Sequence, residues 1–133
     1  MAHPLLKWAA LVLFFGYAAT LVFAGAVGAV AAPFDLSLTA GLDDPEPSLL
    51  AQHRFLRAVE LGFGVFSLVY WRSIFRRRAF NRGFLAVMTA GAAARLLGLA
   101  VDGVPSAAML SFLAWELVGV AAIFAYTSGT LED

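Results

Sequence analysis

The sequence has no cysteine, only two histidines and few charged residues of either sign. The absence of cysteine excludes disulfides, thiolate metal sites and a cysteine nucleophile. Because nitrogen ligands are also scarce, we predict neither a metal site nor a cofactor. The chain also contains no phosphate-binding loop, dinucleotide fingerprint, zinc-protease motif or nucleophile elbow.

Charge is scarce, and what is present is balanced. Hydrophobic residues make up 62% of the 133 residues and charged residues 14%, and the formal net charge is zero. Ordinary soluble domains have about 45–50% apolar and about 25% charged residues. The composition therefore indicates an integral membrane protein and gives no reason to expect a nucleic-acid partner. If each span needs about 20 residues, four spans nearly exhaust the chain and leave no room for a soluble catalytic domain.

Four apolar runs predict an all-α, integral membrane four-helix bundle that forms a single domain over residues 1–133. The spans are expected at about 8–32, 53–72, 83–101 and 106–126. Residues 33–50 combine acids with prolines and are expected to form an acidic outer loop. The first run ends in small residues, as a signal peptide does. Its length of about 25 residues exceeds the roughly 7–15 of a signal-peptide core, so we favour a retained span.

Arginines concentrate in one connection, residues 72–82, which is expected to be a basic loop. Loops rich in Lys and Arg stay on the cytoplasmic side of a membrane, so this loop and both termini are predicted to be cytoplasmic. The acidic loop and the turn at Asp102 then lie outside. Arg76, Arg77 and Arg78 also suit anionic lipid headgroups, although such a run more often only sets topology.

A second set of ionisable residues falls within the predicted spans. One charge at the bilayer centre costs about 2.5–3.5 kcal/mol on translocon scales. The set has equal numbers of positive and negative groups, so it can neutralise itself if the helices turn these faces towards one another. Its members are Arg54, Arg57, Glu60, Arg95, Asp102 and Glu116.

Spacing and depth indicate which of these groups meet. Arg95 is expected to pair with Glu60 or Glu116 deep in the bundle. Asp102 is expected to pair with Arg54 or Arg57 nearer the outer surface. Such pairs are either a lock that fixes helix register or the wall of an outward-facing polar pocket between the second, third and fourth helices.

Several short motifs carry a resemblance to a known family. They are His53-Arg-Phe-Leu56, Glu60-Leu-Gly-Phe-Gly64, Gly91 to Arg95, Asp102-Gly-Val-Pro105 and Trp115-Glu-Leu117. Together they resemble a family of small bacterial four-helix membrane proteins classed as a domain of unknown function. The likeness runs from the loop before His53 to the end of the chain. It implies an inner-membrane protein whose pattern residues include Arg54, Glu60, Arg95, Asp102, Pro105 and Glu116, and it implies no reaction.

Two functions fit these observations. The first is a non-enzymatic module that docks on a larger membrane complex or on a second copy of itself, or that binds a membrane lipid or other amphiphile in the polar pocket. The second is a membrane-embedded enzyme or proton-coupled transporter that uses Glu60 or Glu116 as acid or base, tuned by Arg95. We favour the first because the sequence has no catalytic motif.

Overall fold

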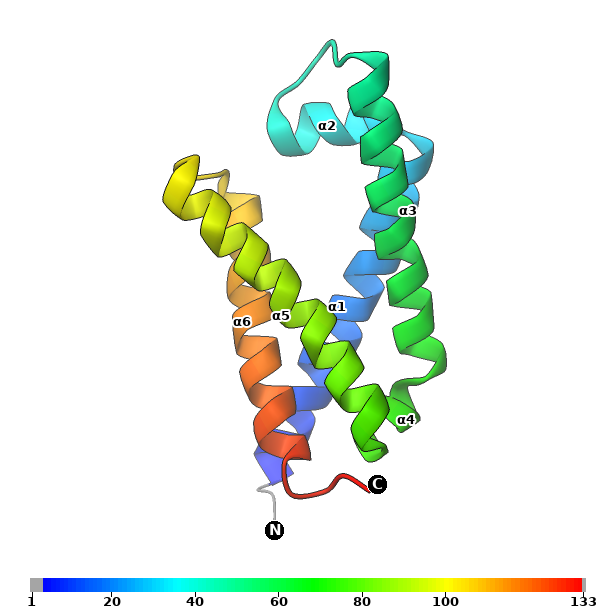
Figure 1. Ribbon diagram of the computed structural model, residues 1–133, viewed down its shortest axis with the longest axis vertical. Helices are drawn as coiled ribbons and strands as arrows, with labels where there is room; N and C mark the ends of the chain where they lie inside the picture. The colour runs from blue at the N-terminus through cyan, green and yellow to red at the C-terminus, as the bar shows by residue number, and fades with distance from the viewer. Residues whose placement is uncertain (1–3, 133) are drawn as a thin grey trace. The chain divides into compact units, whose positions relative to one another are not determined.

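The computed structural model describes residues 4–132, and within this range the protein is built from six helices (Figure 1). Their bounds are α1 Pro4–Val30, α2 Ala32–Ala40, α3 Pro47–Val69, α4 Trp71–Arg76, α5 Arg78–Val101 and α6 Ala107–Thr127. The only strand-like feature among these residues is an isolated bridge between Arg77 and Glu132. The prediction of an all-α protein is confirmed.

The helices form two compact units. Unit 1 contains residues 4–17 and 69–132, and unit 2 is Ala18–Leu68. Helix α1 supplies its first half to unit 1 and its second half to unit 2. Unit 1 therefore holds the start of α1 with α4, α5 and α6, and unit 2 holds the end of α1 with α2 and α3.

The core of unit 1 is aromatic. Phe14 of α1 is fully buried, and its ring lies 5.1 Å from the rings of both Phe75 of α4 and Phe84 of α5. Trp115 of α6 donates its indole N–H to the carbonyl of Leu13 at 3.1 Å. Edge and tilted ring contacts of this kind contribute about 0.5–1.5 kcal/mol each beyond the area that they bury. They attach the first half of α1 to the other helices of its unit.

The link between α4 and α5 is much shorter than the predicted basic loop 72–82. Only Arg77 lies outside a helix there, in an extended conformation, because α4 ends at Arg76 and α5 begins at Arg78. The loop prediction is wrong since arginine is a good helix former and charge alone does not end a helix. The Glu132 amide donates to the Arg76 carbonyl at 2.7 Å, which satisfies an acceptor at this break.

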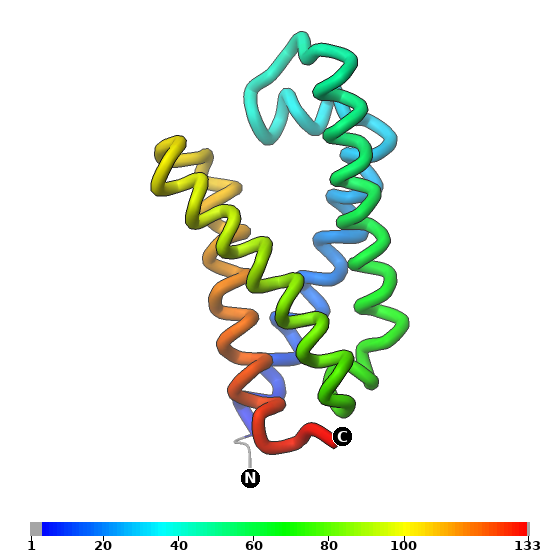
Figure 2. Tube along the Cα trace, viewed as in Figure 1, coloured from blue at the N-terminus to red at the C-terminus, as the bar shows by residue number. Residues whose placement is uncertain are grey.

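In unit 2 the chain changes direction at a break between α1 and α2. Pro33 has no N–H, so the α1 ladder cannot continue through it, and the chain starts α2 with proline in the first turn. Helix α2 ends at Gly41, whose φ of +66° is the left-handed conformation that glycine adopts without strain. Figure 2 shows α3 then running back beside the second half of α1. The predicted acidic loop 33–50 is thus wrong over α2 and over the start of α3.

Within residues 4–132, three helices are long and apolar enough to cross a membrane, as expected of an integral membrane protein: α1, α5 and α6. Helix α5 begins five residues before the predicted span at 83. Helix α3 begins at Pro47, before the predicted 53, and ends at Val69. Its first half carries the ionisable residues of the predicted second span, and it is not among the three. The four-span count therefore stays a prediction.

Candidate functional site

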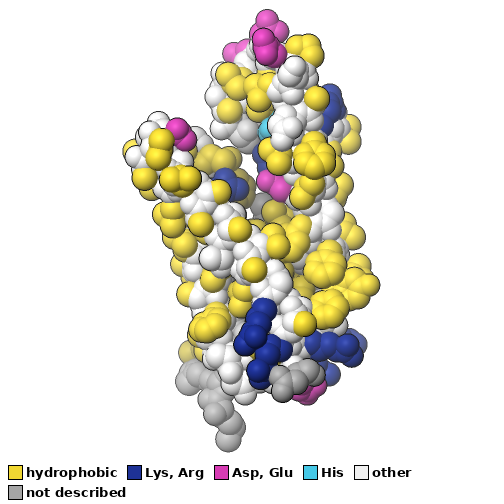
Figure 3. Space-filling view, in the orientation of Figure 1, with side chains coloured by type: hydrophobic (Ala, Val, Ile, Leu, Met, Phe, Trp, Pro, Cys, Tyr) yellow, Lys and Arg dark blue, Asp and Glu magenta, His cyan; other side chains and the backbone are white. Residues whose placement is uncertain are grey.

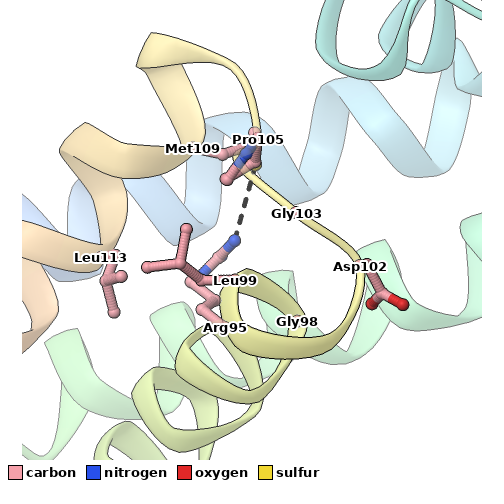
Figure 4. A pocket seen from close by; sticks show the side chains of 8 residues that line it. All are labelled: Arg95, Gly98, Leu99, Asp102, Gly103, Pro105, Met109 and Leu113. Carbon is pink, nitrogen blue, oxygen red and sulfur yellow. Dashed lines mark hydrogen bonds between the residues drawn. The ribbon is translucent and has the colours of Figure 1, made fainter.

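Unit 1 contains a cavity of about 220 Å³ at the connection between α5 and α6, which we call the α5–α6 cavity. Two local features form the turn that closes this cavity. Gly103 has a φ of +103°, and the Ser106 hydroxyl accepts a hydrogen bond from the Met109 amide at 3.4 Å, which caps α6. Most of the lining is apolar. The lining residues are Arg95, Gly98, Leu99, Asp102, Gly103, Pro105, Met109 and Leu113 (Figure 4).

Arg95 is the polar centre of this cavity. Its Nε atom donates to Oε2 of Glu116 at 3.1 Å, and its Nη1 atom lies 3.5 Å from the sulfur of Met109. The guanidinium also lies 5.9 Å from the centre of the Phe112 ring, within cation–π range. The Glu116 side chain is 6% exposed and that of Arg95 is 34% exposed. One partner is therefore buried behind the cavity and the other faces into it.

Gly91 of α5 lies beside the carboxylate of the pair. A Cβ atom placed on Gly91 would lie 3.8 Å from Oε1 of Glu116, in ordinary van der Waals contact. Gly91 is one turn before Arg95 on α5, so the face that carries the guanidinium is also the face next to the carboxylate of α6. The structure thus forms one of the two pairs predicted for Arg95.

Asp102 lies in the turn between α5 and α6, as the sequence predicts. It is exposed in the α5–α6 turn, and Figure 4 shows its carboxylate directed away from the Arg95 guanidinium. Its predicted partners, Arg54 and Arg57, belong to unit 2, so these pairings stay predictions, as does the pairing of Arg95 with Glu60.

Unit 2 contains a second set of charges, which we call the Asp35 cluster: Asp35, His53, Arg57 and Glu60. Oδ2 of Asp35 lies 2.6 Å from Nε2 of His53 and accepts from Nε of Arg57 at 2.7 Å. Nη1 of Arg57 donates to Glu60 at 2.7 Å. The Asp35 and Arg57 side chains are only 6% and 14% exposed. This cluster joins α2 to α3.

Sequence reasoning missed Asp35. It was assigned to a loop, whereas it lies in the first turn of α2, where a helix dipole favours an acid. The signal that would have found it is the stripe on α3. His53, Arg57 and Glu60 are spaced as i, i+4 and i+7, so they share one face and need an anion from another segment.

Arg54 has a structural role. Its Nη1 atom donates to the carbonyls of Ala29 at 2.6 Å and of Val30 at 2.8 Å. In a continuous helix the Ala29 carbonyl would accept from residue 33, which is a proline and has no N–H. Arg54 therefore caps the end of α1 and satisfies the acceptor that Pro33 leaves open.

The arginines of the α4–α5 junction are all exposed, and Figure 3 shows Lys and Arg side chains gathered at this end of unit 1. None of them lines the α5–α6 cavity. They are Arg72, Arg76, Arg77, Arg78 and Arg82.

The two sets of charges differ in whether their arginine is enclosed or faces a cavity. Among residues 4–132, no buried side-chain nitrogen or oxygen lacks a hydrogen-bond partner. Arg57 is enclosed by carboxylates on two sides, whereas Arg95 directs part of its guanidinium into a cavity. No group of three His, Cys, Asp or Glu side chains in the described chain is arranged to hold a metal ion. The α5–α6 cavity is thus the better candidate for a ligand site.

Comparison with known proteins gives the family and no activity. No curated protein and no solved structure matches the chain. The model of one protein family, described as a domain of unknown function, covers residues 5–127, which is nearly all of the sequence. The chain therefore belongs to the DUF4345 family.

Proposed function

We propose that the protein is an integral membrane module that binds a lipid or another amphiphile in the α5–α6 cavity without converting it chemically. One observation carries the proposal. A partly exposed guanidinium, held by a buried carboxylate, faces an otherwise mainly apolar cavity at the ends of two candidate spans. Ligand sites are typically apolar with a few placed polar groups that orient the ligand.

The guanidinium has capacity for a ligand. Arginine carries five N–H donors on three nitrogens. Among the described residues, Glu116 receives Nε and Met109 lies beside Nη1. The donors that remain can bind an oxygen of a headgroup while the chain of the amphiphile follows the apolar wall.

The experiment fills the cavity. Leu99→Trp puts a larger side chain into the lining, and Leu97→Trp makes the same change at a position that is 65% exposed. We expect protein purified in mild detergent to carry a lipid that mass spectrometry detects. Leu99→Trp should lose it and Leu97→Trp should keep it. An empty wild-type protein, or equal retention by both variants, would refute the proposal.

We further propose that α3 is a fourth span and that both termini face the cytoplasm of a bacterium. The support is the neutralisation of α3: its arginines are occupied by carboxylates and carbonyls, which lowers the cost of placing them in a bilayer. Single cysteines at Lys7 and Thr130 test this, because the native chain has none. A membrane-impermeant thiol reagent should label both positions from the same side. Labelling from opposite sides would mean an odd number of spans.

A second candidate is a membrane-embedded enzyme or proton-coupled transporter, favoured by the burial of Glu116 beside Arg95. A carboxyl group in such a place is a candidate acid or base. If so, Glu116→Gln should abolish turnover or proton-coupled uptake while leaving lipid retention unchanged. Docking on a larger complex or on a second copy stays a prediction.

A further inference from the structure

The charges around the α5–α6 cavity discriminate among amphiphiles. Arg95 is the only cation among the residues that line it, and Glu116 already pairs with this guanidinium. Asp102 adds a carboxylate at the turn. The positive charge is therefore neutralised before a ligand arrives, and an anionic headgroup would bring an excess of negative charge.

The depth of the site also favours an uncharged headgroup. Arg95 lies six residues before the end of α5 at Val101, or about 9 Å along the helix at about 1.5 Å per residue. Half of the hydrocarbon core is about 15 Å thick. A headgroup that reaches Arg95 leaves bulk water, and burying a net charge costs far more than burying a neutral group that finds a hydrogen bond.

Size narrows the class further. A cavity of about 220 Å³ is larger than the cavities of about 150 Å³ that accept benzene. It can hold a small headgroup with the first carbons of a chain. It is too small to enclose a whole lipid, so the acyl chain has to leave it.

We propose that the ligand class is an uncharged amphiphile whose head carries hydroxyl or carbonyl oxygens, as a monoacylglycerol does. One head oxygen accepts from the guanidinium of Arg95, and the chain leaves along Leu99 and Leu113. This assignment rests on the proposed function, since it names the ligand of the same cavity.

Monoolein and oleate test the assignment, because they share an acyl chain and differ in charge. Their binding to the purified full-length protein in uncharged micelles is measured at alkaline pH, at which oleate is ionised. We expect monoolein to bind at least about tenfold more tightly, which corresponds to about 1.4 kcal/mol. Oleate binding as tightly or more tightly would overturn the assignment and leave amphiphile binding intact. If neither binds, and no lipid co-purifies, the proposed function fails as well.

A variant should reduce or abolish the preference for monoolein. Glu116→Gln removes the carboxylate that neutralises Arg95, so oleate should bind about tenfold more tightly than it does to the wild type, while monoolein changes little. Glu132→Gln is the matched control, because this exposed acid of the same unit is held through its backbone. A folded Glu116→Gln variant with unchanged oleate binding would contradict the proposal. If the variant does not fold, the wild-type comparison still decides.

Discussion

A double-mutant cycle can show whether the pair of Arg95 and Glu116 is required for the stability of the fold. Removing one partner of a buried ion pair costs about 3–5 kcal/mol, because the other charge is left without compensation. Here Glu116 is buried but 34% of the Arg95 side chain is exposed, so the remaining guanidinium can turn towards the membrane surface. We expect Glu116→Leu to lower the free energy of unfolding by about 2 kcal/mol.

The double variant Arg95→Met with Glu116→Leu is the informative member. It replaces the pair by apolar side chains of similar size next to Met109 and Leu113, and such replacements are often neutral or stabilising. We expect its stability to return to within about 1 kcal/mol of the wild type. Its ligand binding should be lost, because the donors of Arg95 are gone.

Unfolding in mixed micelles of a mild and a denaturing detergent, followed by tryptophan fluorescence, measures these differences. The tryptophans are Trp8, Trp71 and Trp115, and all lie in unit 1 with the pair, so the signal reports on the correct unit. A double variant that is at least as unstable as Glu116→Leu would refute the reasoning. The pair would then be required for the fold itself.

Three further predictions concern the rest of the chain. Gly25→Ala should destabilise the protein by about 1–3 kcal/mol by overpacking, because its Cβ atom would lie 2.6 Å from the Leu61 backbone nitrogen. Gly62→Ala should stabilise it by up to about 1 kcal/mol, because its Cβ atom would meet nothing within 4 Å in the described chain, and unfolding in detergent compares the two variants. Asp35→Leu should cost about 3 kcal/mol in the same assay, because it removes the more buried of the two carboxylates that hold Arg57 and also the partner of His53. Changing the arginines at 76–78 to glutamine should lower the amount of anionic lipid that co-purifies, measured by mass spectrometry, without changing binding in the α5–α6 cavity.

Sequence reasoning could find the long helices because their cause is local. A span needs an uninterrupted apolar run, and such a run is visible in the sequence around α1, α5 and α6. Helix ends were harder to place. Pro33 and Gly41 were interpreted as loop residues, whereas proline in a first turn and glycine after a last turn are also the signs of a short helix. The same residues therefore predicted two structures, and the helix is the correct one.

The pairing of charges could be predicted only in part. The expected depths of the charged residues limited Arg95 to two partners, Glu60 and Glu116, and the short turn between α5 and α6 brings Glu116 to it. Asp35 was missed because its contact with Arg57 depends on the break after α1, which turns α2 back towards α3. No periodicity within one helix contains that information.

The contrast between the two arginines explains why one set of charges is the better site. Arg57 is enclosed by two carboxylates, and its contact with Asp35 fixes α2 against α3. Arg95 belongs to a helix pair that a short turn already joins, and apolar side chains would hold that pair together as well. We therefore propose that a ligand, rather than the fold, accounts for the charge of Arg95 at the wall of a cavity in an apolar protein.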